Sequence, residues 1–296
     1  MKINHWINAF RLRTLFLSLS CIWAGLICVS FKQQLDLPIS VFNLLTALFL
    51  QILSNLANDY GDSIHGADHE DRKGPKRMVQ AGLISAPQMK KAMILFAVLS
   101  FVSGCCLLYF AMPNIGLFAT SILLAVGILS IIAAIAYTNG KNPYGYAGLG
   151  DISVFIFFGF VSVLGTQYLQ TAGVSENALY LSIAYGCLSV GVLNLNNMRD
   201  IESDATASKK SIPVRLGLNM AKKYHTAILI IAWLCLLRFI FLSLQDHQWA
   251  WAISFVLLPN ISMAVKAKDY QSFDPLLKWL SLSTFLMTII LYVGSL

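Results

Sequence analysis

The residues of this chain that are best suited to chemistry gather in short stretches at the ends of apolar runs. The first such stretch, N-L-A-N-D-Y-G-D, contains Asn55, Asn58, Asp59 and Asp62. If the preceding helix continues through it, these residues share one face, because positions three, four and seven apart do so. An ionised carboxylate beside hydrocarbon costs about 2.5 to 3.5 kcal/mol on insertion scales, so such groups normally line a wet cavity or meet a cation. Carboxylate and amide oxygens are hard donors, and the pattern therefore predicts a magnesium site.

A second stretch repeats this pattern after a later apolar run. Asn196 and Asn197 precede Asp200 and Asp204, and the two aspartates share a helical face because they are four residues apart. Basic residues that can meet phosphate charge follow both stretches: Arg72, Lys73, Lys76 and Arg77 after the first, and Lys209, Lys210 and Arg215 after the second. Two acidic helix ends of this kind indicate an internal duplication whose halves face each other across one site.

The chemistry that fits such a site is transfer of a group from a diphosphate. Two carboxylate clusters can hold two magnesium ions with a diphosphate bridged between them. A substrate with a charged diphosphate head and a long apolar tail would place its head in the polar cap and its tail between membrane helices. Magnesium, arginine and lysine would stabilise the charge that develops on the departing diphosphate. The allylic cation left behind would alkylate an electron-rich aromatic ring.

The composition shows which elements must position these residues. With 57% hydrophobic residues, 12% charged residues and a mean hydropathy of +0.68, the chain is more apolar than ordinary soluble domains. We therefore expect an all-α, polytopic membrane protein that forms one transmembrane domain over residues 1–296. The net charge of +7 does not indicate nucleic-acid binding, because the basic residues lie in short connections between apolar runs.

Uncharged runs of about 20 residues, enough to cross a bilayer, recur along the chain. Pro113 and Gly116 supply a turn that splits the long uncharged stretch between Ala92 and Gly140, and Pro259 is expected to kink the eighth span. We expect pseudo-repeat halves of approximately 14–137 and 151–296. The nine predicted spans are 14–31, 37–57, 92–112, 115–137, 151–170, 177–197, 224–244, 248–265 and 277–295.

The basic residues predict the orientation of these spans. If the N-terminus is cytoplasmic, every lysine and arginine except Lys32 and Arg238 lies on the cytoplasmic side, which is 21 minus 2, or 19. This bias predicts an integral protein of the cytoplasmic (inner) membrane. The N-terminus and the loops 58–91, 138–150, 198–223 and 266–276 would be cytoplasmic, and the C-terminus external or periplasmic.

These motifs resemble the UbiA superfamily of membrane prenyltransferases. The similarity lies in N-D-x-x-D at Asn58–Asp62, N-N-x-R-D-x-x-x-D at Asn196–Asp204 and R-x-x-T-L at Arg11–Leu15. Within the family, Y-T-x-G-x-x-P-Y-G-Y-x-G-L-G-D at Tyr137–Asp151 and V-R-L-G at Val214–Gly217 are similar to the branch that serves menaquinone synthesis. The resemblance implies a nine-helix, Mg²⁺-dependent enzyme that joins a polyprenyl diphosphate to 1,4-dihydroxy-2-naphthoate, with loss of carbon dioxide and release of diphosphate.

The resemblance also implies roles for individual residues. Asn58, Asp59, Asp62, Asp200 and Asp204 would bind metal and diphosphate, and the four aspartates would be catalytic. Tyr137 would face the allylic cation. Either Asp68 or Asp71 would be a third aspartate of the first motif, and either Lys209 or Lys210 would contact substrate. The remaining substrate-binding candidates are Arg13, Asn55, Asn58, Arg72, Arg77, Asn196, Asn197 and Arg215.

Other interpretations stay open at this stage. A related enzyme of the same family could use 4-hydroxybenzoate, haem or a glycerol phosphate as acceptor. A cation-coupled transporter is less consistent with the pattern, because transporters place ionisable groups near the bilayer midplane, whereas these groups lie at helix ends on one side. Tyr137, Tyr144 and Tyr146 could also be aromatic residues of the membrane interface. The sequence indicates neither the prenyl chain length nor the oligomeric state.

Overall fold

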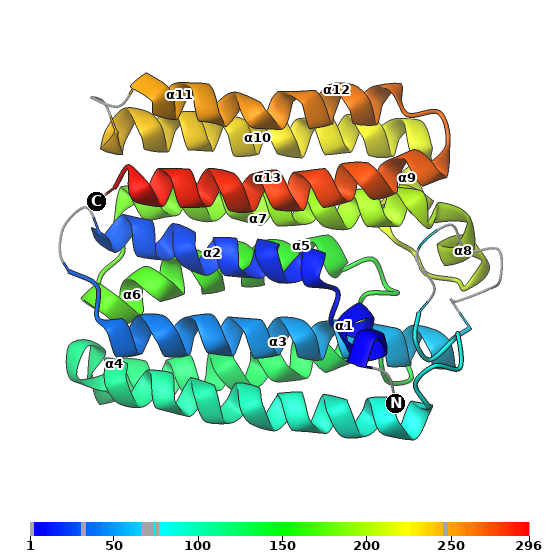
Figure 1. Ribbon diagram of the computed structural model, residues 1–296, viewed down its shortest axis with the longest axis horizontal. Helices are drawn as coiled ribbons and strands as arrows, with labels where there is room; N and C mark the ends of the chain where they lie inside the picture. The colour runs from blue at the N-terminus through cyan, green and yellow to red at the C-terminus, as the bar shows by residue number, and fades with distance from the viewer. Residues whose placement is uncertain (1–2, 31–33, 67–73, 75–76, 245–247, 296) are drawn as a thin grey trace.

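The computed structural model describes residues 3–30, 34–66, 74, 77–244 and 248–295. Within these ranges the chain is all-helical and contains no strand, as the composition predicted. The long helices lie side by side along one direction, and the two ends of the chain lie at opposite ends of the bundle (Figure 1). Three short helices, α1 (Ile3–Phe10), α8 (Ile201–Thr206) and α9 (Ile212–Leu216), gather at the end where the N-terminus lies, so the polar connections form a cap there.

Seven helical segments in the described part of the chain are long and apolar enough to cross a membrane. Five correspond to single helices, and two are composites: Gly150–Thr171 consists of α5, η1 and α6, and Tyr270–Val293 consists of η3 (Tyr270–Ser272) and α13. The single helices are α2 (Leu12–Ser30), α3 (Leu37–Ile64), α4 (Ala86–Ala136), α7 (Glu176–Arg199) and α10 (Leu218–Ser243). The chain is therefore an integral membrane protein.

The helix α4 accounts for two of the expected spans. Its 51 residues would extend about 76 Å at 1.5 Å each, far more than the roughly 30 Å of a hydrocarbon core. Gly116 breaks the helical path with φ 78° and ψ 164°, a conformation that glycine adopts without steric cost. The chain turns back at this point, and its two arms lie side by side (Figure 1). The predicted turn at Pro113–Gly116 is confirmed, although the first arm stays helical through Pro113 up to Gly116, beyond the predicted end at residue 112.

The eighth expected span is interrupted where Pro259 predicted a kink. It consists of α11 (Gln248–Ser254), a 3₁₀ turn (Phe255–Leu257) and α12 (Leu258–Lys266), with the proline in the first turn of α12. Other helices extend beyond the predicted spans: α3 ends at Ile64 instead of 57, α4 begins at Ala86 instead of 92, and α10 and α13 (Phe273–Val293) begin before residues 224 and 277. These helices extend into polar sequence that a count of apolar residues cannot assign.

The fifth span contains a stretch of π-helix, which the sequence pattern did not predict. Residues Phe155–Leu164 form this element, between α5 (Gly150–Val154) and α6 (Gly165–Thr171). A Cβ atom at Gly159 would lie 2.6 Å from the carbonyl oxygen of Ser182, so this glycine lets η1 pack directly on α7. Wide π-turns of this kind are frequent at functional sites.

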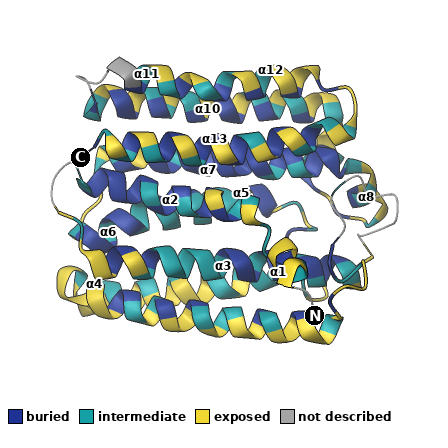
Figure 2. Ribbon diagram, in the orientation of Figure 1, coloured by how far each residue is buried: buried dark blue, intermediate teal, exposed yellow. Residues whose placement is uncertain are grey.

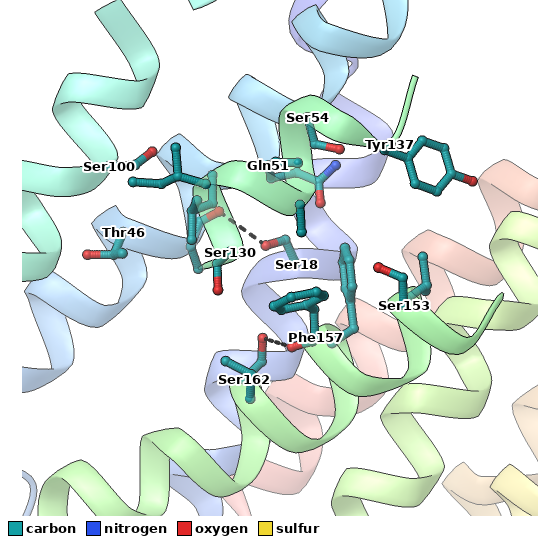
Figure 3. Close-up of a pocket in the computed structure, with 18 of the residues that line it drawn as sticks. Ser18, Thr46, Gln51, Ser54, Ser100, Ser130, Tyr137, Ser153, Phe157 and Ser162 are labelled. Carbon is teal, nitrogen blue, oxygen red and sulfur yellow. Dashed lines mark hydrogen bonds between the residues drawn. The ribbon is translucent and has the colours of Figure 1, made fainter. Parts of the chain in front are cut away.

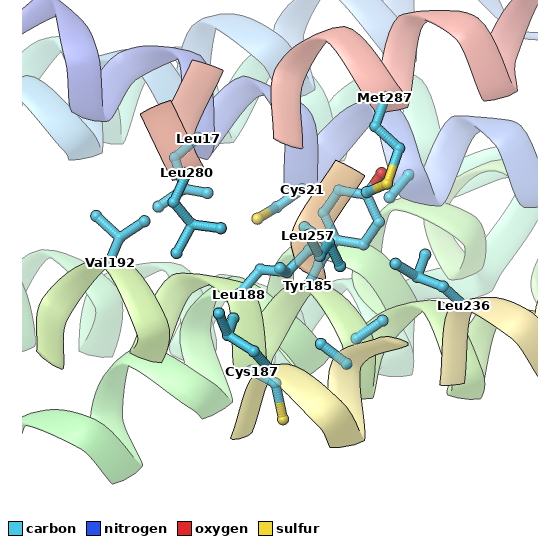
Figure 4. Close-up of a cluster of buried hydrophobic side chains, with 14 of the residues drawn as sticks. Leu17, Cys21, Tyr185, Cys187, Leu188, Val192, Leu236, Leu257, Leu280 and Met287 are labelled. Atoms are coloured by element: carbon cyan, nitrogen blue, oxygen red, sulfur yellow. The ribbon is translucent and has the colours of Figure 1, made fainter. Parts of the chain in front are cut away.

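The largest apolar core lies between α2, α7, α10 and α13. Leu17, Cys21, Leu188 and Leu280 are among the side chains that meet there (Figure 4). The most buried of the spans is α7, whereas α4 shows the most exposed apolar surface, as Figure 2 also shows along its outer arm. This arrangement makes α7 a central support and leaves α4 to face lipid. It also fixes the ends of α3 and α7, which carry the two acidic motifs.

Candidate active site

The first acidic motif occupies the last two turns of α3. The Asp62 carboxylate, which is 2% exposed, forms an ion pair with Arg77 and accepts a hydrogen bond from the Tyr146 hydroxyl at 2.8 Å. Arg77 also donates to the backbone oxygen of Asn58 at 2.7 Å, so the chain returns to α3 after the loop. The side-chain oxygen of Asn58 accepts from Thr138 at 3.2 Å. Residues from two separate connections, the one between α3 and α4 and the one that follows α4, therefore meet around Asp62.

The second acidic motif spans the end of α7 and the short helix α8 (Ile201–Thr206). Lys209 Nζ lies 3.1 Å from Asp204 Oδ1, and both residues are buried. Burial raises the pKa of the Asp204 carboxyl, and the charges of Asp200 and Asp62 raise it further against the opposing effect of Lys209. Burial alone would lower the pKa of Lys209, but the surrounding carboxylates reverse this effect and raise it. Lys209 therefore does not fully offset the burial and the negative charges around Asp204, so further positive charge would favour the ionised form of this carboxyl.

Tyr146 and Lys209 connect the two acidic motifs. Lys209 Nζ lies 5.8 Å from the centroid of the Tyr146 ring, within the range of a cation–π interaction, while the Tyr146 hydroxyl bonds Asp62. Burial and the neighbouring Asp62 raise the pKa of Tyr146, so its hydroxyl keeps its proton and donates. A continuous set of contacts thus runs from Asp62 through Tyr146 and Lys209 to Asp204.

A cavity of about 340 Å³ opens beside these residues. Its polar end is formed by the site side chains, and its walls continue between α3, α4 and η1, where Ser54, Gln51, Ser130 and Phe157 lie around it (Figure 3). Apolar residues line the deeper part: Ile22, Leu107, Leu108, Leu123, Leu124, Val161 and Leu169. The expected site residues that line the cavity are Arg13, Asn55, Asn58, Asp62, Arg77, Tyr137, Asn196, Asn197 and Lys209. The cavity thus matches a ligand with a charged head and an apolar tail.

Tyr137 lies at the end of α4, where its ring lines the cavity (Figure 3). A Cβ atom at Gly145 would lie 3.0 Å from the Tyr137 ring, and one at Gly150 would lie 2.7 Å from its hydroxyl oxygen. Gly145 and Gly150 therefore let the ring pack closely against the backbone. Burial raises the pKa of Tyr137, with Asp151 adding to the effect, so the ring stays neutral.

Five of the expected site residues that the structure describes do not line the cavity. The Asp59 carboxylate accepts from the N–H groups of Met78 and Val79 at 2.9 and 3.0 Å. Arg215 is exposed and donates to the backbone oxygens of Lys210 and Ala147 at 3.0 and 2.6 Å, so its contacts support loop structure instead of a phosphate site. The other three residues are Asp200, Asp204 and Lys210, of which Asp204 borders the cavity through its contact with Lys209.

The structure distinguishes the two candidate lysines. The Lys210 side chain is exposed, and the backbone N–H of Lys210 donates to the backbone oxygen of Tyr146 at 2.9 Å. Lys209 instead is 6% exposed and lines the cavity. Of the two alternatives in the sequence, Lys209 is therefore the one that lies at the cavity.

Asp200 belongs to a buried charge network that the sequence did not indicate. Arg199, 1% exposed, donates to both carboxylate oxygens of Asp200 at 2.9 and 2.8 Å and to Asp274 at 2.5 Å. Asp274, in the first turn of α13, also accepts from Arg13 at 2.9 Å and pairs with Lys278 at 2.9 Å. Asp274 thus ties α2, α7 and α13 together behind the site. Its only sequence signal was an isolated acidic residue next to an apolar run.

Arg11, which the sequence analysis did not assign to the site, lines the cavity from a strained backbone position. Its φ of 52° is uncommon for a residue other than glycine and separates α1 (Ile3–Phe10) from α2. Asn55 fixes this break, because its side-chain amide donates to the Phe10 oxygen at 2.8 Å and to the Thr14 hydroxyl at 2.9 Å. Asn55 therefore contributes to the site by shaping the junction that carries Arg11.

Near the predicted metal site, the structure contains oxygen donors of the type that magnesium prefers. Within the described ranges, no three His, Cys, Asp or Glu side chains come together to hold an ion by themselves. However, Asp204 Oδ2 and Asn197 Oδ1 are buried without a hydrogen-bond partner, which is costly unless a ligand completes the site. Oxygen donors that need phosphate or water to complete a coordination shell fit magnesium. Arg72, Asp68 and Asp71 lie outside the described residues.

Comparison with known proteins agrees with this fold and site. The model of the UbiA prenyltransferase family matches residues 18–291, and the chain belongs to this family. It is 40% identical over 298 residues to a 1,4-dihydroxy-2-naphthoate octaprenyltransferase of Haemophilus influenzae, covering 99% of this chain and 96% of the relative. It is 39% identical to the protein of that name in Escherichia coli K12, covering 94% of this chain and 90% of the relative.

Solved structures give the same architecture at much lower sequence identity. A UbiA homolog from Aeropyrum pernix K1, in its apo structure, superimposes with a TM-score of 0.69 at 17% identity and covers 96% of this chain and 97% of its own. A UbiA homolog from Archaeoglobus fulgidus, bound to GPP and Mg²⁺, gives a TM-score of 0.65 at 15% identity, covering 98% and 99%. These matches establish the UbiA fold for this chain.

Proposed function

We propose that the protein transfers a polyprenyl group from polyprenyl diphosphate to 1,4-dihydroxy-2-naphthoate. The observation that carries this proposal is the joining of Asp62 and Asp204, through Tyr146 and Lys209, at the polar end of a cavity whose depth is apolar. A prenyl diphosphate has this distribution of charge and hydrocarbon. The two naphthoate octaprenyltransferases at 39% and 40% identity support the choice of acceptor.

The reaction begins with cleavage of the bond between the allylic carbon and the diphosphate oxygen. The electron pair leaves with the diphosphate, and Arg77, Lys209 and Arg13 are placed at the polar end of the cavity to meet its charge. The ring carbon that carries the carboxylate then bonds the allylic carbon. Carbon dioxide departs and leaves its bonding electrons to the ring, so the products are the prenylated naphthoquinol, carbon dioxide and diphosphate.

Magnesium is the metal that this donor set fits best. Asp62 and Asp204, with the amide oxygens of Asn58 and Asn197, would hold it, and Asp200, held by Arg199, would add negative charge beside them. When bound, the metal supplies neutralising charge for the departing diphosphate. The known structures of this fold bound to GPP and Mg²⁺ support this assignment.

Tyr137 would act on the carbon end of the substrate. Its ring lines the cavity at the polar end and has no charge. The face of an aromatic ring attracts cations, so Tyr137 would stabilise the allylic cation without capturing it. The close packing of Gly145 and Gly150 on this ring fixes its orientation.

We further propose that this site faces the cytoplasm in a bacterial inner membrane. The connections that build it carry most of the basic residues, which is the distribution expected of cytoplasmic loops. A charged diphosphate and a carboxylated naphthol would reach the site from the aqueous side, while the polyprenyl chain would enter from the bilayer.

An acceptor panel tests the proposed function. Membranes that contain the protein would be incubated with magnesium, labelled prenyl diphosphate, and either 1,4-dihydroxy-2-naphthoate or 4-hydroxybenzoate, with membranes that lack the protein as control. We expect label in the naphthoate product alone. Preferential prenylation of 4-hydroxybenzoate would assign the protein to the ubiquinone branch of the family and refute our choice of acceptor.

A further inference from the structure

The Asp59 carboxylate has contacts that differ from those of the other carboxylates in the acidic motifs. It is 2% exposed, and its two oxygens accept from two successive backbone N–H groups, those of Met78 and Val79. It does not line the cavity, whereas Asp62, three residues later, does. Because each of its oxygens accepts from a backbone donor and the group does not line the cavity, Asp59 is fixed in place away from the position that a metal in the cavity would occupy.

The segment that Asp59 holds begins with Arg77. Because Met78 and Val79 follow Arg77 directly, fixing their N–H groups also fixes the backbone from which the Arg77 side chain extends. That side chain then pairs with Asp62 and donates to the Asn58 oxygen at 2.7 Å. Asp59 and Asp62 therefore hold one residue from two sides, Asp59 through the backbone and Asp62 through the guanidinium.

Hydrogen bonds and apolar packing within residues 77–84 hold the backbone of this segment in one conformation. Ala81 N–H donates to the Arg77 oxygen at 2.9 Å, and Ile84 N–H donates to the Met78 oxygen at 3.1 Å. Met78 and Ile84 are 7% and 0% exposed and pack in the apolar cluster of α1, α3 and α4. Residues 77–84 thus form a compact turn, and Asp59 is its polar attachment to α3.

We propose that Asp59 is a positioning residue that places Arg77 for the diphosphate, and that it does not bind the metal. The proposal rests on the proposed function for the identity of the ligand that Arg77 meets. It reassigns one aspartate of the first acidic motif, and it explains why two adjacent polar residues, Asn58 and Asp59, have different surroundings. Asn58 lines the cavity, and Asp59 holds the loop.

The first test measures the attachment without substrate or metal. Hydrogen exchange at the Met78 and Val79 amides would be compared in the purified protein and in Asp59→Asn, which replaces one acceptor oxygen by a donor. We expect exchange at these two amides to accelerate by about tenfold or more, the scale of a lost hydrogen bond to a charged group. Asp36→Asn is the matched control, because Asp36 accepts from the Ile39 N–H at 3.0 Å at the far end of the same helix. It should leave Met78 and Val79 unchanged.

The second test is a double-mutant cycle that separates positioning from metal binding. Asp59→Asn and Arg77→Gln should each raise KM for prenyl diphosphate by about tenfold, and the double variant should be no worse than Arg77→Gln alone. The magnesium concentration for half-maximal activity should not change between Arg77→Gln and the double variant. The proposal would be overturned if the two substitutions raised KM multiplicatively in the double variant. It would also be overturned if Asp59→Asn raised the magnesium requirement in the Arg77→Gln background.

A second variant and the exchange measurement distinguish failure of this proposal from misfolding and from failure of the proposed function. If Asp59→Asn does not fold, Asp59→Glu moves the two acceptor oxygens outward while keeping their charge, and the same cycle applies with a smaller expected change in KM. If the chain prenylates no naphthoate at all, the proposed function fails, while the amide exchange still reports whether Asp59 holds the Arg77 segment. Unchanged exchange in both Asp59 variants would refute the attachment itself.

Discussion

The Tyr146 hydroxyl donates to the Asp62 carboxylate over 2.8 Å, and this bond brings the connection between α4 and α5 into the first acidic motif. The same tyrosine ring lies near the Lys209 ammonium, which pairs with Asp204 of the second motif. The two acidic motifs are therefore connected through a residue that belongs to neither of them. The contact explains why a glycine-rich turn is part of the site.

Replacing Tyr146 with Phe should lower turnover by about tenfold, since a hydrogen bond to a charged group contributes about 1.5 to 3 kcal/mol. The reason is that Asp62 would lose a donor that orients it between Arg77 and the cavity. The measurement is kcat for prenyl transfer in membranes with equal amounts of protein.

Tyr224→Phe is the matched control for this variant. The Tyr224 hydroxyl donates to the Asp151 carboxylate at the same distance, 2.8 Å, but neither residue lines the cavity. We expect turnover per folded molecule to stay within about twofold of the unmodified protein in this control. Equal losses in the two variants would contradict a specific role for Tyr146.

Asp62→Ala and Asp204→Ala should each reduce turnover by a factor on the order of 10² to 10³, the scale for loss of one preorganised electrostatic group. Each change also breaks a buried ion pair, with Arg77 or with Lys209, so turnover is compared per folded molecule in the membrane. Asp269→Ala is a suitable control, since Asp269 is an exposed carboxylate that caps a turn through Ser272 at 2.9 Å. Near-normal activity of the Asp62 and Asp204 variants would exclude the proposed site.

The positions of the helices were largely predictable from the sequence, because a bilayer requires long uncharged runs and the chain has few charges to interrupt them. The break at Gly116 and the interruption near Pro259 followed from the two residue types that disturb helices most. The π-helix of Phe155–Leu164 was not predictable, since it depends on close packing of Gly159 against α7. Polar helix ends, such as the start of α13, were also missed because apolar runs do not extend to them.

The site was predictable only where its residues carried a motif. Asp62, Asp204 and Lys209 line or border one cavity, as the two acidic stretches indicated. Spacing alone, however, cannot separate a carboxylate that faces a cavity from one that holds a loop, and Asp59 is of the second kind. The sequence did not indicate the role of Asp274, because that role depends on tertiary contacts with α2 and α7.

Asp274→Asn should destabilise the protein, because it weakens the partner of a buried arginine. Breaking a buried ion pair costs about 3 to 5 kcal/mol, and the partial exposure of Asp274 and the remaining Asp200 contacts reduce this value. We expect a fall of several degrees in the apparent Tm in detergent. Lys278→Gln removes the exposed partner of the same carboxylate and should change Tm little. A larger effect of the Lys278 variant would contradict this account of the network.

The predicted orientation can be tested with reporter fusions. A reporter at the C-terminus should locate outside the cytoplasm, and reporters inserted after Gly74 and after Ser208 should locate in the cytoplasm, because the basic residues cluster on that side. The two ends of the chain lie at opposite ends of the bundle, which agrees with an odd number of crossings. A cytoplasmic C-terminus would show that the interrupted segment of α11 and α12 does not cross the membrane.

The most direct test of the proposed reaction is its stoichiometry with carboxyl-labelled 1,4-dihydroxy-2-naphthoate and a polyprenyl diphosphate. Because the carboxylate marks the carbon to be alkylated, carbon–carbon bond formation and decarboxylation should be coupled. We predict one labelled carbon dioxide for each prenylated naphthoquinol, and loss of both products when magnesium is chelated. A prenylated product that keeps the carboxylate, or carbon dioxide released without prenylation, would contradict the account.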